Sequence, residues 1–568
     1  MFFVALATDY DGTIASQGMV DEPTRKALEE VRRSGRKLIL VTGRDLLDLR
    51  RVFEGLELFD LVVAENGGLL YNPASQEETP LTDPPPQSLV DRLRELGIKP
   101  LSIGRTIVAT WEPNEGIVLQ TIRDLALEQH IIFNKGAVMV LPGGINKASG
   151  LKAALKLLNL SPHNVVGIGD AENDQAFLSA CGCAVAVGNA LDTVKERADL
   201  VVADHGKGLV ELSRLLIDDD LASITPRVPK ARPVLGEADG GSAYTIGLDE
   251  TVLITGSSGG GKSTVVTAVL EQIRDLSYQF CVVDPEGDYG ELRDAVIMGD
   301  AKQTPRIAEV LDLLEKPDRN VVLNLLAVDP SERPRFLSQF LPEIAKLRAE
   351  TGRPHWIVLD EVHHCLPANW QAAPITLPRG LPAAFAVTVH PEEVSKEFLS
   401  LVTTVVGVGE GGPKAIAKFC EATGRQAPQA DLNWREGQVL VLDSAGGLTH
   451  VKANKPKEKQ QRHVRKYAEG ELGEDRSFYF RGPKNALNLR AQNLAVFLQL
   501  AAGVDEETWL HHLHEGAYSR WFREAIKDEQ LAADAAEVES NRDLSAQQSR
   551  DRFKELVERR YTAPAKQS

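Results

Sequence analysis

Cysteine is scarce in this sequence, with five residues in 568 at irregular spacing. So few thiols do not supply a disulfide framework, and they predict a protein of a reducing, cytoplasmic compartment. The C-x-C formed by Cys181 and Cys183 has no second pair of ligands and does not indicate a zinc site. Long apolar runs are lacking too. No stretch approaches the roughly 20 residues that span a bilayer, so no membrane partner is expected.

Positive charge is in deficit, because 64 Lys and Arg face 81 Asp and Glu, a formal net charge of −17. This balance disfavours a protein that coats nucleic acid through general electrostatics, although it leaves a local basic channel open. Residues 452–466 are the exception, with seven Lys or Arg and one Glu. The hydrophobic fraction of 43 % is ordinary for a globular protein. At roughly 100–200 residues a domain, the length predicts three or four domains.

Strand-like apolar stretches alternate with amphipathic helical stretches in two long regions, which predicts an α/β fold with parallel sheets. We predict a Rossmann-like core with an inserted α/β subdomain, then a second α/β domain of the P-loop NTPase type, then a small, mainly helical domain. The predicted boundaries are 1–218 for the first domain (insert about 80–142), 219–245 for a linker, 246–452 for the second domain, 453–475 for a basic linker and 476–568 for the helical domain.

The first predicted strand ends in Asp9-Tyr10-Asp11-Gly12-Thr13. Side chains at i and i+2 of an extended chain point the same way, so both aspartates face one site at the carboxyl end of a strand. Asp9 is suited to attack phosphorus as a carboxylate nucleophile. Asp11 is suited to protonate the leaving oxygen and then to activate water.

Further residues that suit phosphoryl chemistry follow in order along the chain. Thr42 follows a strand and Lys147 precedes a helix, and both are candidates to hold phosphoryl oxygens. Asp170 and Asp174 follow the strand VVGIGD. Carboxylate oxygens are ligands that Mg²⁺ prefers. The predicted metal site therefore contains Asp9, Asp170 and the backbone carbonyl of Asp11, with Asp174 completing or orienting it.

The motifs DYDGT and GDAENDQAF, with Thr42 and Lys147 between them, resemble the haloacid dehalogenase superfamily. They are most similar to its Cof-type branch of sugar-phosphate, phosphoglycolate and sucrose-phosphate phosphatases. The resemblance implies that residues 80–142 are a cap that covers the site and supplies substrate specificity. Within it, Arg105 and Lys135 are candidates to contact an acidic leaving group, with solvated surface charge as the alternative. A degenerate, inactive domain is a further alternative.

A second motif, TVLITGSSGGGKST at 251–264, matches G-x-x-x-x-G-K-[ST] between an apolar strand and a helical stretch. Glycines let backbone N–H groups surround phosphates at a helix N-terminus. Lys262 is expected to reach the β- and γ-phosphates of ATP, and Ser263 to bind Mg²⁺. The predicted nucleotide-binding residues here are Gly256, Ser257, Ser258, Gly259, Gly260, Gly261, Lys262, Ser263 and Thr264.

The apolar segment HWIVLDE completes the predicted ATP site. Asp360 is expected to hold the Mg²⁺ shell, and Glu361 to orient or activate the attacking water. A glutamate in this place favours hydrolysis over transfer to a second substrate.

The segment 284–289, DPEGDY, and the P-loop resemble the HerA/FtsK type of ATPase, especially its HerA-like branch. His390 stands where that branch usually has a sensor glutamine. The resemblance implies ring assembly, hence a possible homo-oligomer, with an arginine from a neighbouring subunit completing the site. Arg379 and Arg425 are candidates for that arginine, and surface residues are the alternative.

The last predicted domain carries aromatic and basic residues that allow two interpretations. Phe478, Tyr479 and Phe480 either stack on nucleic-acid bases or form a small core. Arg481 and Arg490 either contact phosphate or solvate helices.

The leading hypothesis is an Mg²⁺-dependent hydrolase of a small phosphorylated metabolite, acting through an aspartyl-phosphate and fused to an ATP-binding and hydrolysing module. One alternative is a polynucleotide end-processing kinase and phosphatase. Another is a HerA-like motor or scaffold with an accessory phosphatase. Nucleic acid is the less favoured partner because of the net charge of −17.

Overall fold

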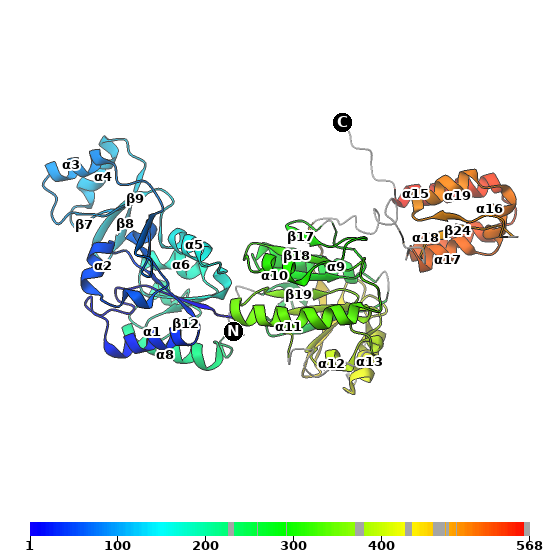
Figure 1. The fold of residues 1–568 in the computed structure, drawn as a ribbon, viewed down its shortest axis with the longest axis horizontal. Helices are drawn as coiled ribbons and strands as arrows, with labels where there is room; N and C mark the ends of the chain where they lie inside the picture. Colours follow the sequence, from blue (N-terminus) through cyan, green and yellow to red (C-terminus); the bar gives the residue numbers. More distant parts are fainter. Residues whose placement is uncertain are drawn as a thin grey trace.

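A computed structural model shows three parts in a row (Figure 1). The amino-terminal part lies beside the central part, and the carboxyl-terminal helices lie at the opposite side. The predicted fold class, two α/β parts followed by a helical one, is confirmed. The structure describes residues 1–224, 232–257, 260–290, 292–369, 380–426, 434–457, 472, 476–483, 485–526 and 528–561.

The first part is built on an eight-stranded sheet in the order β12-β11-β10-β1-β2-β3-β4-β5. Neighbouring strands from β12 to β3 are parallel, and β4 and β5 add an antiparallel edge. Helices lie on both sides of this sheet (Figure 1), so its central strands are apolar and buried. The strands are β1 Ala5–Thr8, β2 Lys37–Val41, β3 Leu61–Ala64, β4 Leu69–Asn72, β5 Glu77–Pro80, β10 Val165–Gly169, β11 Cys183–Ala186 and β12 Leu200–Val201. The helices are α1 Glu22–Arg33, α2 Leu46–Val52, α5 Lys147–Leu157, α6 Gln175–Ala180, α7 Asp192–Lys195 and α8 His205–Asp219, with short 3₁₀ turns at Leu56–Leu58, Glu65–Gly67, Pro162–Asn164 and Glu172–Asp174.

A small subdomain interrupts this part within the predicted insert, and we call it the cap. Its four strands lie in the order β6-β7-β9-β8, and α3 and α4 pack on one face through a separate apolar cluster. The opposite face carries Met139, whose sulfur lies close to Gly43 of the core. The cap elements are α3 Gln87–Glu95, β6 Ser102–Ile103, β7 Val108–Trp111, α4 Glu115–Asp124, β8 Gln129–Asn134 and β9 Ala137–Pro142.

The central part contains an eleven-stranded sheet in the order β14-β13-β23-β22-β21-β15-β20-β19-β16-β18-β17. The strands from β21 to β17 are parallel, and β22, β23, β13 and β14 form an antiparallel edge. The strands are β13 Val234–Ala238, β14 Ala243–Thr245, β15 Thr251–Thr255, β16 Phe280–Asp284, β17 Ala295–Met298, β18 Asn320–Asn324, β19 Trp356–Leu359, β20 Ala384–Thr388, β21 Thr404–Val408, β22 Val439–Leu442 and β23 Leu448–Ala453. The helices are α9 Lys262–Asp275, α10 Ile307–Leu314, α11 Arg333–Thr351, α12 Lys396–Leu399 and α13 Gly412–Thr423, with 3₁₀ turns at Val362–His364 and Pro391–Glu393.

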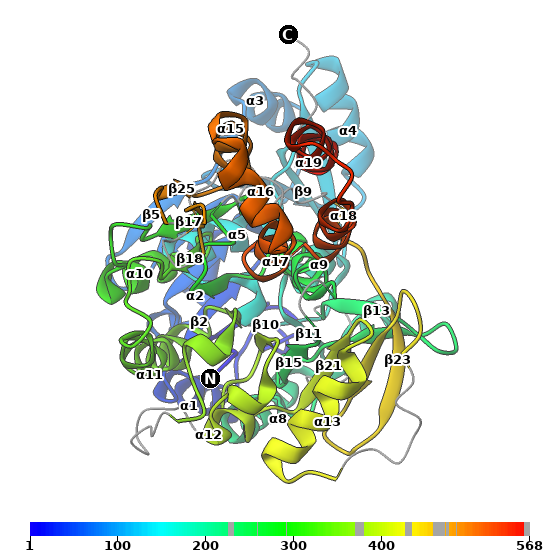
Figure 2. The same cartoon turned by 90° about the vertical axis from the view of Figure 1, so that its right-hand side faces the viewer.

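One predicted boundary needs correction. The sequence assigned 219–245 to a linker, but β13 and β14 within it belong to the central sheet. Strand β13 pairs with β23, with Gly236 opposite Ala453, and the two strands lie side by side in Figure 2. The hairpin has no periodic apolar pattern because it is a short edge of the sheet, in which Leu235 is the large apolar side chain that is buried.

The last part is a hairpin and five helices around an aromatic core. Phe478 and Phe480 are buried in this core, so of the two interpretations that the sequence allowed, a small core holds for them and base stacking does not. Tyr479 is half-buried with the guanidinium of Arg481 over its ring, and Arg490 bonds to Ser477 and the carbonyl of Leu472. The elements are β24 Phe478–Phe480, β25 Leu489–Ala491, α15 Leu494–Gly503, α16 Glu506–His514, α17 Ala517–Glu524, α18 Glu529–Ser540 and α19 Ala546–Tyr561. Most of the predicted basic linker, 458–471 and 473–475, lies outside the described residues. Within the part of the chain that the structure describes, no helix has both the length and the apolar character to cross a membrane.

Candidate active sites

The first candidate site lies at the carboxyl edge of the first sheet. β1 and β10 are parallel neighbours, so Asp9 and Asp170 follow them at the same edge. Thr42 follows β2 there, is buried, and accepts a hydrogen bond from the backbone N–H of Arg44. Lys147 is the first residue of α5, whose start is held by a capping box between Asn146 and Ser149.

Lys147 joins two of the predicted acids. Its Nζ lies 2.6 Å from Oδ1 of Asp9 and 2.5 Å from Oδ1 of Asp174, and its side chain is buried. Oδ2 of Asp9 accepts a hydrogen bond from the hydroxyl of Thr13 at 3.1 Å. Oδ2 of Asp174 accepts from the backbone N–H groups of Asp170 and Ala171 at 3.0 and 2.9 Å. Asp174 is therefore fully engaged with protein donors, which suits an orienting role.

Burial sets the protonation of this cluster. It raises the pKa of Asp9 to about 7, helped by the charge of Asp174 and opposed by Lys147. Burial also raises the pKa of Asp170, against the effect of Lys135. Burial alone would lower the pKa of Lys147, but Asp174 and Asp9 raise it overall, so its ammonium stays charged. Three carboxyl groups, those of Asp9, Asp170 and Asp174, face two ammonium groups here, and a further cation would favour the ionised form of the acids.

Mg²⁺ fits the residues at this edge. Carboxylate oxygens of Asp9, Asp170 and Asp174 lie within 4.8 Å of one another. Oδ1 of Asp170 is a buried acceptor with no hydrogen-bond donor among the described residues. The other oxygen of Asp170 and the backbone carbonyl of Asp11 both face Nζ of Lys135, at 2.5 and 3.1 Å. Two oxygens from adjacent loops thus already converge on one positive charge, as ligands of a hard cation do.

Arg44 is a site residue that the sequence reasoning missed. Its Nε and Nη2 donate to the two carboxylate oxygens of Asp11 at 2.6 and 2.8 Å, and Nη1 donates to Asp48 at 2.5 Å. This bidentate pairing fixes the plane of the Asp11 carboxylate at the mouth of the site. The signal was available, because Arg44 ends the LILVTGR segment that supplies Thr42.

Glu65 is a second missed residue, and it ties the cap to the core. Its buried carboxylate accepts hydrogen bonds from the backbone N–H groups of Arg105 and Thr106 at 2.9 and 2.7 Å, and from the Thr106 hydroxyl at 2.8 Å. Its backbone φ is 52°, an uncommon value for a residue with a side chain. Its three hydrogen bonds to the cap hold the residue in this uncommon backbone conformation.

The two basic residues that the sequence predicted as candidates in the cap lie in different environments. Nε of Arg105 lies 3.1 Å from Glu78, and its side chain is 68 % exposed, so it is a surface residue. Lys135 lies on the turn between β8 and β9, and its ammonium enters the core site at Asp170. Of the two, Lys135 is the cap cation that can meet a leaving group.

The second candidate site surrounds the P-loop. Gly256 follows β15, and a Cβ there would lie 2.1 Å from the carbonyl oxygen of Val408, so only glycine fits. Lys262 begins α9, is buried, and donates from Nζ to the carbonyls of Gly256 and Ser257 at 3.1 and 2.9 Å. The start of a 14-residue helix thus faces the loop, as phosphate binding requires. Ser263 and Thr264 are in the first turn of α9, Gly260 and Gly261 precede it, and Ser258 and Gly259 lie outside the described residues.

Acidic residues gather at the neighbouring strand ends of the second sheet. Asp284 ends β16 and accepts from the backbone N–H groups of Asp288 and Tyr289 at 3.0 and 2.8 Å. Asp360 follows β19, the strand paired with β16. Burial raises the pKa of Asp360 well above its ordinary value, and the charges of Glu361, Asp284 and Asp288 raise it further. These residues suit a bound divalent cation.

Glu361 and the predicted sensor are linked by a histidine that the sequence reasoning did not single out. Glu361 has a strained φ of 38°. Nδ1 of His363 lies 3.5 Å from Oε2 of Glu361 and 3.0 Å from the hydroxyl of Thr388, at the end of β20. The ring of His390 lies 5.7 Å from that of His363, so the predicted sensor residue approaches Glu361 through His363.

The arginine candidates for a subunit-bridging role have different outcomes. Nη2 of Arg425 donates to the carbonyl of Val402 at 2.7 Å, and the guanidinium covers the ring of Phe419, so Arg425 supports its own fold. Arg379 lies outside the described residues. An arginine from the last part does reach the central part, because Nη1 of Arg476 lies 3.5 Å from Glu286 of the DPEGDY segment.

Comparisons with known proteins agree with this division. A family model described as haloacid dehalogenase-like hydrolase matches residues 6–99 and 112–210, and one described as Helicase HerA, central domain, matches residues 247–343. The chain is 30 % identical over 220 residues to a phosphoglycolate phosphatase of Methanothermobacter thermautotrophicus, covering 37 % of this chain and 97 % of that protein. It is 31 % identical over 216 residues to a phosphoglycolate phosphatase of Haloarcula marismortui, covering 36 % of this chain and 94 % of that protein. A haloacid dehalogenase-like hydrolase structure from Bacteroides thetaiotaomicron has 19 % identity and a TM-score of 0.34, with 38 % of this chain and 99 % of that one covered.

Proposed function

Because the chain belongs to the haloacid dehalogenase-like hydrolase family, we propose that it is an Mg²⁺-dependent phosphomonoester hydrolase that works through an aspartyl-phosphate on Asp9. The observation that carries this proposal is the buried Lys147, whose ammonium bridges Asp9 and Asp174, with Oδ1 of Asp170 left without a donor among the residues that the structure describes. A lysine in this place holds the nucleophile and faces the transferred phosphoryl group.

Each residue at the edge has a defined role in this proposal. The Asp9 carboxylate attacks phosphorus while Lys147 and Thr42 bind the phosphoryl oxygens. Asp11, held by Arg44, donates a proton to the leaving oxygen and then takes one from the water that hydrolyses the phosphoenzyme. Asp9 and Asp170 would hold Mg²⁺ with the carbonyl of Asp11. When bound, the ion supplies positive charge against the carboxylates and the phosphoryl oxygens.

The proposed substrate is a small phosphate ester with a second acidic group. The cap lies over the site, and its Lys135 ammonium is the basic group that enters from the leaving-group side. The phosphoglycolate phosphatases that match residues of this part suggest 2-phosphoglycolate as the first compound to test.

The central part is a HerA-type ATPase domain. We propose that it binds ATP with Mg²⁺ through the P-loop and hydrolyses it with Glu361 orienting the water. The support is the approach of Glu361 and the Thr388 hydroxyl to the same nitrogen of His363.

The test measures phosphate release with Mg²⁺ from 2-phosphoglycolate, sugar phosphates and a 3′-phosphorylated oligonucleotide. Wild type should release phosphate from a small ester, and Asp9→Asn should lose at least about 10³-fold in rate while it keeps ATP hydrolysis. Asp11→Asn should accumulate acid-trapped phosphoenzyme from a labelled substrate. Preferential release from the oligonucleotide, or an unaffected Asp9→Asn variant, would contradict the proposal.

A further inference from the structure

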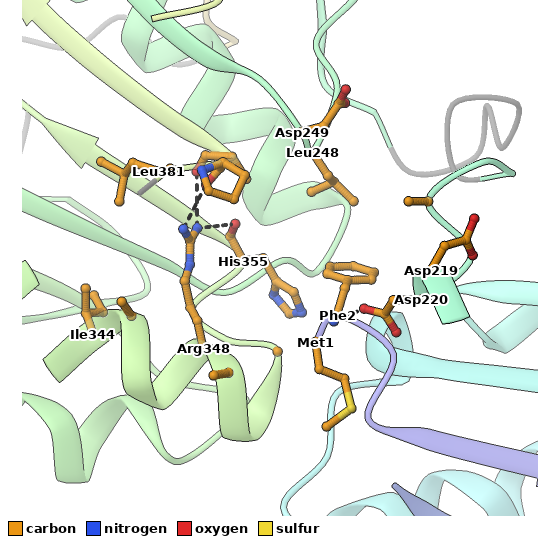
Figure 3. Close-up of a pocket in the computed structure, with 17 residues that line it drawn as sticks. Met1, Phe2, Asp219, Asp220, Leu248, Asp249, Ile344, Arg348, His355 and Leu381 are labelled. Carbon is orange, nitrogen blue, oxygen red and sulfur yellow. Dashed lines mark hydrogen bonds between the residues drawn. The ribbon is translucent and has the colours of Figure 1, made fainter. Parts of the chain in front are cut away.

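The first two parts meet through buried and half-buried side chains at the amino-terminal ends of their strands. Phe2 lies before β1, His163 and Asn164 lie before β10, Tyr278 lies before β16, and His355 lies before β19. We call these five residues the seam. In Figure 3, Phe2 and His355 lie next to each other beside a cavity of about 540 Å³ between the two parts, with ring centroids 6.1 Å apart.

Asn164 is the centre of the seam and is completely buried. Its Nδ2 donates to the carbonyl of Phe2 at 2.7 Å and, more weakly, to that of Gly352 at 3.4 Å. Its Oδ1 lies 3.0 Å from Nε2 of His355. Nδ1 of His355 accepts from the backbone N–H of Gln279 at 2.9 Å, so the proton of the neutral ring is on Nε2 and is donated to Asn164. One amide thus links the starts of β1, β10 and β19.

His163 connects the phosphatase to the P-loop helix. Its Nε2 lies 2.7 Å from the carbonyl oxygen of Leu276, the residue that caps the end of α9. Its ring stacks on that of Tyr278 with centroids 3.9 Å apart and planes 22° apart. Helix α9 has 14 residues and begins at Lys262. The helix that faces the nucleotide phosphates therefore ends, about 21 Å away, on the phosphatase.

The opposite ends of the same strands carry the catalytic acids. Asp9 follows β1, Asp170 follows β10 and Asp360 follows β19. The strands have four or five residues each, about 13–17 Å at 3.3 Å a residue. Because the seam lies at the amino ends, the two sites open away from each other. A product of one site therefore does not pass directly to the other, and communication between them must run through the protein.

We propose that the seam couples the two sites, so that nucleotide bound at Lys262 changes the affinity of the Asp9 site for its phosphate ester. This inference rests on the proposed functions of both sites. Lys262 now donates to the carbonyls of Gly256 and Ser257. A nucleotide phosphate would draw this ammonium away from the two carbonyls, and α9, which begins at Lys262, would transmit the difference as a rigid body to Leu276 and His163. Thermodynamic linkage requires the effect to be equal in both directions.

The experiment uses the Asp9→Asn variant of the full chain, which should bind an ester without hydrolysing it. The Mg²⁺ concentration is kept constant. Calorimetry gives the dissociation constant of 2-phosphoglycolate with and without saturating ADP, and that of ADP with and without 2-phosphoglycolate. We expect both constants to change by the same factor, about fivefold or more. His163→Ala should reduce the factor below about twofold, and His163→Phe, which keeps the ring stack but not the hydrogen bond, should reduce it partly. His450→Ala, on the distant strand β23, is the matched control and should keep it.

Three results would overturn the coupling. These are a factor near one for 2-phosphoglycolate in the chain with an intact seam, a factor near one for ADP in the same chain, and an undiminished factor in both His163 variants. The unfolding temperature of each variant shows whether it is folded. A chain that releases phosphate and hydrolyses ATP but shows no linkage contradicts only the coupling. A chain that releases no phosphate from any ester contradicts the proposed function, and the coupling with it.

Discussion

The ammonium of Lys135, on a turn of the cap, lies 2.5 Å from Oδ2 of Asp170 in the core. The two residues are far apart in sequence and belong to different sheets. Their contact places a positive charge of the cap among the carboxylates of the phosphatase site. A cation bound at Asp170 would repel this ammonium, which would then be available to the leaving group of a substrate.

Replacement of Lys135 should therefore act on substrate choice. Lys135→Ala should raise KM for 2-phosphoglycolate about tenfold, because one charge-assisted contact to its carboxylate is lost. KM for a phosphate ester with a neutral leaving group should change little. Steady-state kinetics on both esters measure the difference. Arg105→Ala is the matched control, since Arg105 pairs with Glu78 on the surface. Equal changes of KM for both esters in Lys135→Ala would show that Lys135 does not contact the leaving group.

Glu361→Gln should separate nucleotide binding from hydrolysis. Lys262 and the P-loop are unchanged in this variant, so the dissociation constant of ATP should stay within about twofold. Hydrolysis should slow by roughly 10²–10⁴-fold, because the carboxylate that orients water is neutralised. Lys262→Ala should instead weaken binding itself. Calorimetry and single-turnover hydrolysis distinguish the two effects, and a fully active Glu361→Gln variant would remove Glu361 from the mechanism.

Gly352→Ala should destabilise the seam. Gly352 ends α11 with a φ of +70°, and a Cβ there would lie 2.3 Å from Nδ2 of Asn164. Gly424 ends α13 with a φ of +72° and would meet nothing within 4 Å, so Gly424→Ala bears only the backbone strain. We expect the free energy of unfolding to fall by about 1 kcal/mol in the control and by about 2–4 kcal/mol in Gly352→Ala. Thermal unfolding compares them, and equal losses would mean that the seam tolerates the added methyl group.

The stability of the seam should depend on pH through His355. Burial holds the pKa of His355 well below its ordinary value, and the neighbouring His163, Arg353 and Arg348 lower it further. The folded ring stays neutral where the unfolded ring, with a pKa of about 6.5, takes up a proton. The stabilisation is therefore complete above about pH 6.5 and falls by about 1.4 kcal/mol per pH unit below it.

Unfolding temperatures between pH 8 and pH 5 measure this dependence. His355→Gln should flatten the slope below pH 6.5, and His450→Gln, remote from the seam, should keep it. Burial lowers the pKa of His163 too, so the His355 variant should retain part of the slope. An unchanged slope in His355→Gln would place the pH dependence elsewhere in the chain.

The predictable residues share a local signature. DYDGT, GGGKST and VLDE each consist of an apolar strand followed at once by the polar group that its end presents. The neighbouring parallel strands β1 and β10 then bring Asp9 close to Asp170, and the parallel strands β15 and β19, on either side of β20, place the P-loop and Asp360 at the same edge of the second sheet. Short contiguous motifs were sufficient to predict these residues, because each polar residue directly follows in sequence the strand that positions it.

The residues that the sequence did not reveal depend on distant partners. Arg44 faces Asp11 33 residues away, Glu65 holds the cap at Thr106, and His363 reaches Thr388. Arg105 and Lys135 looked equivalent because a cap lysine and a surface arginine have the same local pattern. Only the course of β8 and β9 over the core distinguishes them.

By itself, the sequence predicted the two candidate sites and the strands that carry them, because apolar periodicity and adjacent motifs are local properties. The tertiary structure decided how these centres are oriented. It placed the amino ends of both sheets against each other, with Asn164 and His355 bonded across 191 positions. No sequence pattern predicts that contact, because each of the two residues simply precedes an apolar strand. The contact forms only when the two sheets pack against each other in the folded chain.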